Sequence, residues 1–143
     1  MEPIHILHVE DSEGDILLIR DAIEEGGIAH TLDVVRNGQE AMEFLNKTGN
    51  FTDKQTPNLI LLDINMPVMN GHELLDFIKT DERFKHLPVI MLTTSGSQDD
   101  IFKAYQKYTN SYIVKPGNVN DFERVVRAIE NFWITVAQLP KKP

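Results

Sequence analysis

The sequence predicts an α/β fold in which helices cover both faces of one parallel sheet. Short apolar runs alternate with longer amphipathic segments along the whole chain. The run Leu59-Ile60-Leu61-Leu62 contains no polar residue, which is typical of a strand covered on both faces. Strict alternation of strands and helices indicates that successive strands are parallel, because each helix returns the chain to the starting edge of the sheet.

Five apolar runs are predicted as strands, and the amphipathic segments between them as helices. The expected strands are Ile4–Val9, Thr31–Val35, Leu59–Leu62, Pro88–Leu92 and Ser111–Val114. The expected helices follow Ser12, follow the turn Asn37-Gly38, and cover about His72–Thr80, Gln98–Lys107 and Val119–Gln138. Right-handed crossovers restrict such a chain to a doubly wound, flavodoxin-like sheet with the strand order 2-1-3-4-5.

A chain of 143 residues is expected to form a single domain, residues 1–143, with its core within residues 4–138. Ser12 is suited to cap the first helix, and Gly26-Gly27 to end it. The polar segment Thr48–Pro57 lacks periodicity and predicts a surface loop, whereas Leu139–Pro143 predicts a frayed tail. So short a tail predicts that no effector domain is present.

Composition excludes several functional classes. Fourteen Lys and Arg against 22 Asp and Glu give a formal charge of −8, which argues against nucleic acid as a partner. The absence of cysteine excludes disulfides, thiolate metal sites and thiol catalysis. The sequence lacks a signal peptide, and no apolar run approaches the ~18 residues of a membrane span. A cytoplasmic protein that does not bind membranes is expected.

Reactive side chains follow four of the predicted strands. Glu10 and Asp11 come directly after the first strand and Asp63 after the third, whereas Thr93 follows the fourth strand and Lys115 the fifth. Ligands of open α/β sheets bind at this edge. Each residue alone is explained by helix capping or solvation, but their co-location favours a metal and phosphate site. Adjacent carboxylates repel by on the order of 4 kcal/mol per pair. Mg²⁺, which prefers oxygen ligands, and the lysine ammonium are expected to compensate.

Four motifs together resemble the receiver domain of two-component response regulators, which has the CheY-like (βα)5 fold. They are Glu10-Asp11, LLDINMPVMNG at Leu61–Gly71, Leu92-Thr93, and YIVKP at Tyr112–Pro116. The resemblance covers about residues 4–138. It is closest to the small response regulators associated with cyanobacterial phytochromes. It implies a phosphorelay protein that signals through protein–protein contacts, and not an enzyme beyond its own phosphorylation and dephosphorylation.

The resemblance implies a role for each residue of the acidic edge. Asp63 would accept a phosphoryl group from the phosphohistidine of a sensor histidine kinase. Asp11 and Asp63 would bind Mg²⁺, Glu10 would bind it through a water, and Asn65 through its main-chain carbonyl. Lys115 would pair with the phosphoryl group. Phosphoryl transfer needs mainly alignment and charge neutralisation, which these groups supply.

Three further residues are implied to transmit the signal. Thr93 would hydrogen-bond a phosphoryl oxygen, and Tyr112 would be an aromatic switch that turns inward when Thr93 moves. Pro116 would follow a cis peptide bond. The added phosphoryl group carries about −1.5 to −2 charges, to which Thr93 and Lys115 can respond.

Two interaction surfaces are expected. The kinase, expected to be a phytochrome, would dock on the first and last helices, on a surface that includes Asp15, Ile16, Leu18 and Ile19. For the three apolar residues of this set, a place in the core is an equal alternative. A homodimer would form through the fourth helix, the fifth strand and the last helix, because the last helix carries a broad apolar stripe with terminal aromatics.

Three other functions fit the sequence less well. An Mg²⁺-dependent phosphohydrolase with an aspartyl-phosphate would carry a second aspartate two residues after the nucleophile, where this chain has Asn65. A nucleotide- or flavin-binding module would need a glycine-rich loop after the first strand, where Glu10–Gly14 is acidic. A pseudo-receiver that binds without chemistry would not need the complete set of site residues.

Overall fold

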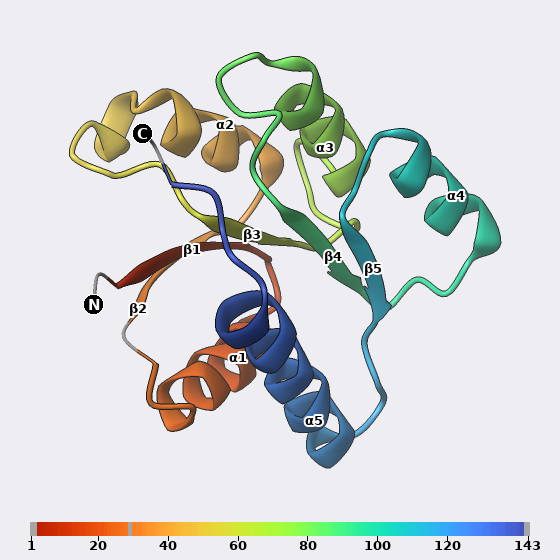
Figure 1. Cartoon of the computed structure of the whole chain (residues 1–143). Coiled ribbons are helices and arrows are strands. Elements are labelled where there is room, and N and C mark those ends of the chain that lie inside the picture. Colours follow the sequence, from red (N-terminus) through yellow and green to blue (C-terminus); the bar gives the residue numbers. More distant parts are fainter. Residues whose placement is uncertain (1–2, 29, 142–143) are drawn as a thin grey trace.

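The computed structural model describes residues 3–28 and 30–141; residues 1–2, 29 and 142–143 of the expected domain lie outside this description. It contains one parallel sheet with the order β2-β1-β3-β4-β5, which confirms the predicted fold (Figure 1). The strands are β1 (Ile4–Val9), β2 (His30–Val35), β3 (Leu59–Leu62), β4 (Val89–Thr93) and β5 (Ser111–Val114). The helices are α1 (Glu13–Glu25), α2 (Gly38–Asn46), α3 (Gly71–Thr80), α4 (Gln98–Gln106) and α5 (Val119–Ile129).

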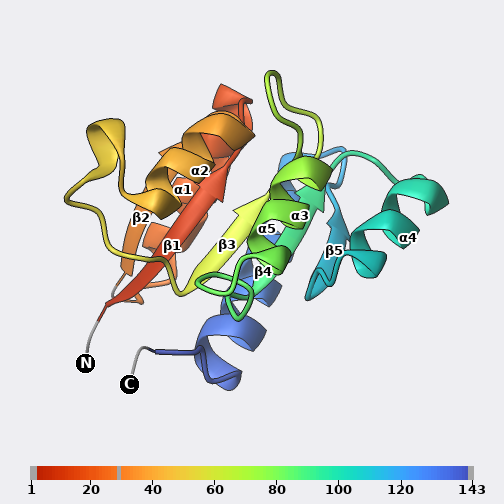
Figure 2. The same cartoon turned by 90° about the horizontal axis from the view of Figure 1, so that it is seen from above.

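The helices form two layers around the sheet. Helices α1 and α5 contact each other on one face, and α3 contacts both α2 and α4 on the other. Figure 2 shows all strand arrows pointing to the same edge, from which the chain enters each following helix. Within the described residues, no helix is long and apolar enough to span a bilayer.

The central strands supply both halves of the core through side-chain alternation. In β3, Ile60 and Leu62 join the apolar cluster under α2 and α3, whereas Leu59 and Leu61 join the cluster under α1 and α5. All four side chains are buried. Each buried side chain of this kind contributes roughly 1.5–3 kcal/mol, so the uninterrupted apolar run anchors both layers to one strand.

Every α-helix begins with a side-chain cap at the edge where the strands end. Each capping side chain accepts a hydrogen bond from the backbone N–H three residues later. The caps are Ser12, Asn37, Asn70, Ser97 and Asn118. Caps of this kind stabilise a helix by about 0.5–2 kcal/mol. They also define where each loop at this edge ends, and the predicted cap at Ser12 is confirmed.

The end of the chain differs from the predicted long helix. Helix α5 ends at Ile129 and continues as a π-helix, η2 (Glu130–Val136). In this wider turn Trp133 packs against the α1–α5 cluster and contacts Phe132 edge-on, with ring centroids 5.3 Å apart. The tail is not frayed over its described part, because Leu139 also packs against that cluster.

The structure adds detail to two further expectations. Of the two places considered for Ile16 and Ile19, the structure shows the core, since they are 2% and 0% exposed in α1. The predicted loop Thr48–Pro57 contains a 3₁₀ turn, η1 (Gly49–Phe51). Phe51 packs there against Phe44, with ring centroids 5.4 Å apart. This aromatic contact ties the polar segment to α2.

Glu130 is an ionisable group buried where α1 meets the π-helix. Both of its carboxylate oxygens lack a hydrogen-bond partner among the described residues. A Cβ at Gly26, which caps the C-terminus of α1, would overlap the carboxylate. Burial raises the pKa of the Glu130 carboxyl above its usual 4.5, although Arg127 and His30 act in the opposite direction.

We predict that Glu130→Gln stabilises the protein at alkaline pH. The raised pKa means that the folded chain holds this proton more tightly than the unfolded chain, so the wild type loses stability as pH rises through the folded-state value. Because glutamine cannot ionise, the variant should gain about 1 kcal/mol in free energy of unfolding at pH 8, and less at pH 5. Urea unfolding of both proteins measures this. Glu24→Gln, an exposed change in α1, should have no comparable effect; equal stabilities at pH 8 for wild type and Glu130→Gln would contradict the prediction.

Candidate functional site

Strand register brings three carboxylates together at the carboxyl edge of the sheet. In the β1–β3 pair Val9 lies opposite Leu62, and the backbone N–H of Asp63 donates to Val9 O at 3.1 Å. Glu10, Asp11 and Asp63 each offer an oxygen within 4.8 Å of the others. The predicted convergence of these residues is confirmed, although more than fifty positions separate the first from the last.

Lys115 reaches into this cluster from the end of β5. Its Nζ lies 2.5 Å from Glu10 Oε1, 2.7 Å from Asp15 Oδ2 and 3.9 Å from Asp63 Oδ2. Burial lowers the pKa of Lys115, but the hydrogen bonds to Asp15 and Glu10 and the negative charges of Asp63 and Glu10 together raise it overall. Lys115 is therefore a fixed positive charge, as the sequence predicted. Asp15 was expected on a docking surface, and its ion pair with Lys115 was not predicted. No local sequence pattern indicates a contact between residues that are 100 positions apart.

Glu10 is strongly perturbed by its surroundings. Its side chain is 1% exposed, and burial, reinforced by Asp63, raises the pKa of its carboxyl to about 7, although Lys115 acts in the opposite direction. His8 lies beneath it, with Nε2 3.9 Å from Glu10 Oε1. Burial, together with Lys115 and Arg20, lowers the pKa of His8 to about 3, so this imidazole adds no positive charge near neutral pH.

The donor set fits a hard divalent cation. Three carboxylates share the site, and burial together with the neighbouring Asp63 raises the pKa of one of them, Glu10. Carboxylate oxygens are the ligands that Mg²⁺ and Mn²⁺ prefer, and a dication would favour ionised Glu10. Asn65 follows in the β3–α3 loop with an exposed side chain.

Asp63 presents one carboxylate oxygen away from the backbone. Its Oδ1 accepts a hydrogen bond from the Ile64 N–H at 2.9 Å, whereas Oδ2 faces Lys115. The residue is only 6% exposed. Helix α3 begins directly behind it at Gly71, where a Cβ would overlap the Asp63 carbonyl oxygen and lie 2.7 Å from Ile64 Cα. A glycine is therefore required for this loop to close.

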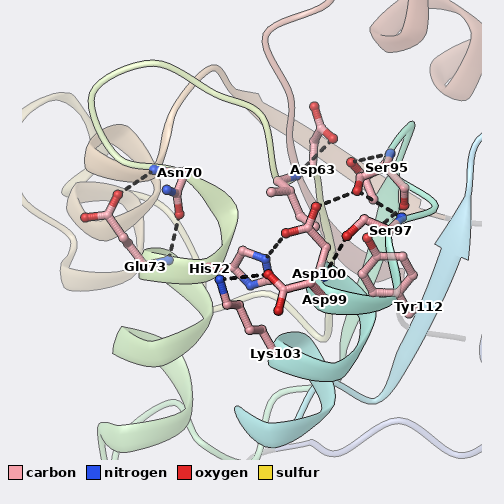
Figure 3. A network of polar contacts seen from close by, with 12 residues as sticks. Asp63, Asn70, His72, Glu73, Ser95, Ser97, Asp99, Asp100, Lys103 and Tyr112 are labelled. Carbon is pink, nitrogen blue, oxygen red and sulfur yellow. Dashed lines mark hydrogen bonds and ion pairs between the residues drawn. The ribbon is translucent and has the colours of Figure 1, made fainter.

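Thr93 and Tyr112 meet at the β4–α4 loop. Thr93 is fully buried, and its Oγ1 lies 3.5 Å from the Ser95 N–H group. The Tyr112 hydroxyl donates to the Ser95 carbonyl at 2.8 Å, and Figure 3 shows its ring beside this loop. The bond from Lys115 to Pro116 is trans, in contrast to the cis bond that the resemblance implied. Most X–Pro bonds are trans, since this form is favoured by about 0.5–1 kcal/mol.

Comparison with known protein families shows to which family the chain belongs. Residues 6–127 match the response regulator receiver domain. The chain belongs to this family. Receiver domains act in phosphorelay signalling and interact with sensor histidine kinases, so this chain is a signalling protein. A role as a phosphohydrolase is not favoured.

Among its relatives is the response regulator Rcp1 of Synechocystis sp., which is 40% identical over 138 residues covering 96% of this chain and 94% of Rcp1. The crystal structure of the phosphorylated cyanobacterial phytochrome response regulator RcpA is similar with a TM-score of 0.95, at 40% identity, and covers 98% of this chain and 100% of that one. The Mn²⁺-bound form of Rcp1 gives a TM-score of 0.94 at 40% identity, covering 97% and 100%.

We predict that Gly71→Ala disturbs the site and that Gly14→Ala does not. The Gly71 substitution forces the β3–α3 loop away from Asp63 and should lower the free energy of unfolding by about 1–3 kcal/mol. Gly14 lies in α1 with nothing within 4 Å of its missing Cβ. Its replacement should stabilise the protein by about 0.5–1 kcal/mol. Chemical denaturation measures both, and a neutral Gly71→Ala would show that the contact is not required.

Proposed function

We propose that Asp63 accepts a phosphoryl group from a sensor histidine kinase. The supporting observation is the orientation of its carboxylate, with Oδ1 held by a backbone N–H and Oδ2 facing the buried ammonium of Lys115. A nucleophilic oxygen beside a fixed cation has the alignment and charge compensation that phosphoryl transfer needs. Lys115 pairs with the transferred phosphoryl group, and Thr93 hydrogen-bonds one of its oxygens.

Mg²⁺ is the proposed metal. Asp11 and Asp63 bind it directly, Glu10 binds it through a water, and Asn65 through its main-chain carbonyl. When bound, the ion neutralises charge on the phosphoryl oxygens. The shared acidic edge and the perturbed Glu10 support this assignment. The Mn²⁺-bound form of Rcp1 is consistent with it, because both ions prefer oxygen ligands.

The proposed partner is a cytoplasmic phytochrome kinase. The similarity to Rcp1 and to a phytochrome response regulator along nearly the whole chain supports this pairing. We propose that residues 1–143 act as one receiver domain. Output then takes place in the cytoplasm through docking to another protein, with Tyr112 as the residue that changes orientation when Thr93 binds the phosphoryl group.

We predict that acetyl phosphate with Mg²⁺ adds one phosphoryl group to the wild-type chain, as measured by intact mass. Asp63→Asn should show no gain, because an amide cannot form the acyl phosphate. Asp53→Asn, an exposed change in the loop before β3, should retain a full stoichiometric gain. Absence of a gain in the wild type, or a gain in Asp63→Asn, would reject the assignment of the phosphoacceptor.

We also propose a homodimer through α4, β5 and α5. Large apolar side chains are exposed on these elements and the turn between them, namely Phe102, Tyr105, Tyr108, Val114 and Val119. Phe102 and Tyr108 are 66% and 75% exposed. Aromatic residues are enriched at protein interfaces, and a second copy of the same surface would cover them.

Phe102→Ser should weaken this dimer at least about tenfold, because truncating an anchoring aromatic residue typically costs about 2 kcal/mol or more of binding free energy. Light scattering at tens of micromolar, with and without phosphodonor, measures the mass. Leu17→Ser is the control, since Leu17 is 51% exposed on α1, outside the proposed interface. A monomeric wild type under both conditions would exclude the dimer.

A further inference from the structure

A chain of polar side chains ties α3 and α4 to the loop between β4 and α4 (Figure 3). His72 Nε2 lies 3.0 Å from Asp100 Oδ1. The Ser95 hydroxyl donates to Asp100 Oδ2 at 2.5 Å. Through its carbonyl, Ser95 also accepts the Tyr112 hydroxyl. One residue of the loop thus contacts α4 through its side chain and β5 through its backbone.

Asp100 departs from the usual behaviour of an acid at its place in a helix. It is the third residue of α4, and its N–H donates to the capping Ser97 Oγ at 3.2 Å. In a capping box the acid at this position bonds back to the N–H of the cap, as Glu73 does in α3. The Asp100 carboxylate instead bonds to Ser95 Oγ and His72 Nε2, outside its own helix.

The order of the three groups excludes a nucleophilic role for Ser95. The carboxylate lies between the hydroxyl and the imidazole, so no imidazole nitrogen is placed to accept the serine proton. A carboxylate only accepts hydrogen bonds, which means that His72 carries its proton on Nε2. Its Nδ1 is buried without a partner among the described residues. Hydrogen bonds from Ser95 and then His72 lower the pKa of the Asp100 carboxyl, so it remains a charged acceptor.

We propose that Asp100 is a positioning residue that holds Ser95, and through it Thr93 and Tyr112, in the arrangement seen here. The Ser95 N–H lies 3.5 Å from Thr93 Oγ1, so a movement of Thr93 toward a phosphoryl group pulls on Ser95. Asp100 resists this movement, because charged hydrogen bonds are stronger than neutral ones. Only this last step rests on the proposed phosphorylation of Asp63.

Asp100→Asn tests the proposal against Asp99→Asn, which removes the same charge one residue earlier. Asp99 is paired with Lys103 at 3.1 Å, and its side chain is 76% exposed. Without phosphodonor, Asp100→Asn should speed hydrogen exchange of the Ser95–Ser97 amides by about tenfold or more, as expected for loss of a charged hydrogen bond. It should also shift the ring resonances of Tyr112. Asp99→Asn should leave both unchanged within about twofold.

A second measurement follows the reaction itself. Asp100→Asn should accept the phosphoryl group from acetyl phosphate about threefold faster or more, since its loop moves more easily. Identical behaviour of the two variants would overturn the proposal, as would a lower melting temperature for Asp100→Asn with unchanged exchange and Tyr112 signals. A wild type that fails to be phosphorylated would reject the proposed function instead, while the exchange and Tyr112 measurements would still decide the role of Asp100.

Discussion

The buried ammonium of Lys115 among acidic side chains is the interaction on which the edge of the sheet depends. Strand pairing forces Glu10 and Asp63 together, and their repulsion in a partly dry setting costs on the order of several kcal/mol. Lys115 compensates part of this cost through hydrogen bonds to Glu10 and Asp15. Burial, reinforced by Asp63, still raises the pKa of the Glu10 carboxyl to about 7. A site with more carboxylates than cationic side chains is suited to binding a metal ion.

This arrangement explains why the fold and the site are inseparable. The apolar strands β1 and β3 align their ends because their side chains are buried on both faces, which fixes register. Gly71 then lets α3 start directly behind Asp63. The core thus positions the carboxylates without the help of a bound ligand. The free energy gained by burying the apolar side chains of the sheet offsets the repulsion between the carboxylates.

Most of the fold follows from local patterns, whereas parts of the site do not. Continuous apolar runs predicted the strands, because a strand buried on both faces carries apolar residues at every position. Ser12 predicted the start of α1, because a capping residue bonds to an N–H group only three positions later. The switch to a π-helix at Glu130 could not be predicted, since it accompanies packing of Trp133 against a core cluster whose members come from distant parts of the chain. The contact of Asp15 with Lys115 could not be predicted either, because an ion pair between residues 100 positions apart produces no periodic pattern in the sequence.

The helix caps at the carboxyl edge have an electrostatic consequence. Five N-termini begin on this side of the sheet, each with unpaired N–H groups and a partial positive charge of about half an elementary unit. The positive ends of their macrodipoles therefore lie on the side of the acidic residues, and the negative ends lie at the opposite edge of the sheet. These partial charges offset part of the negative charge that Glu10, Asp11 and Asp63 place at this edge. An incoming anion therefore meets less repulsion there than the carboxylates alone would produce.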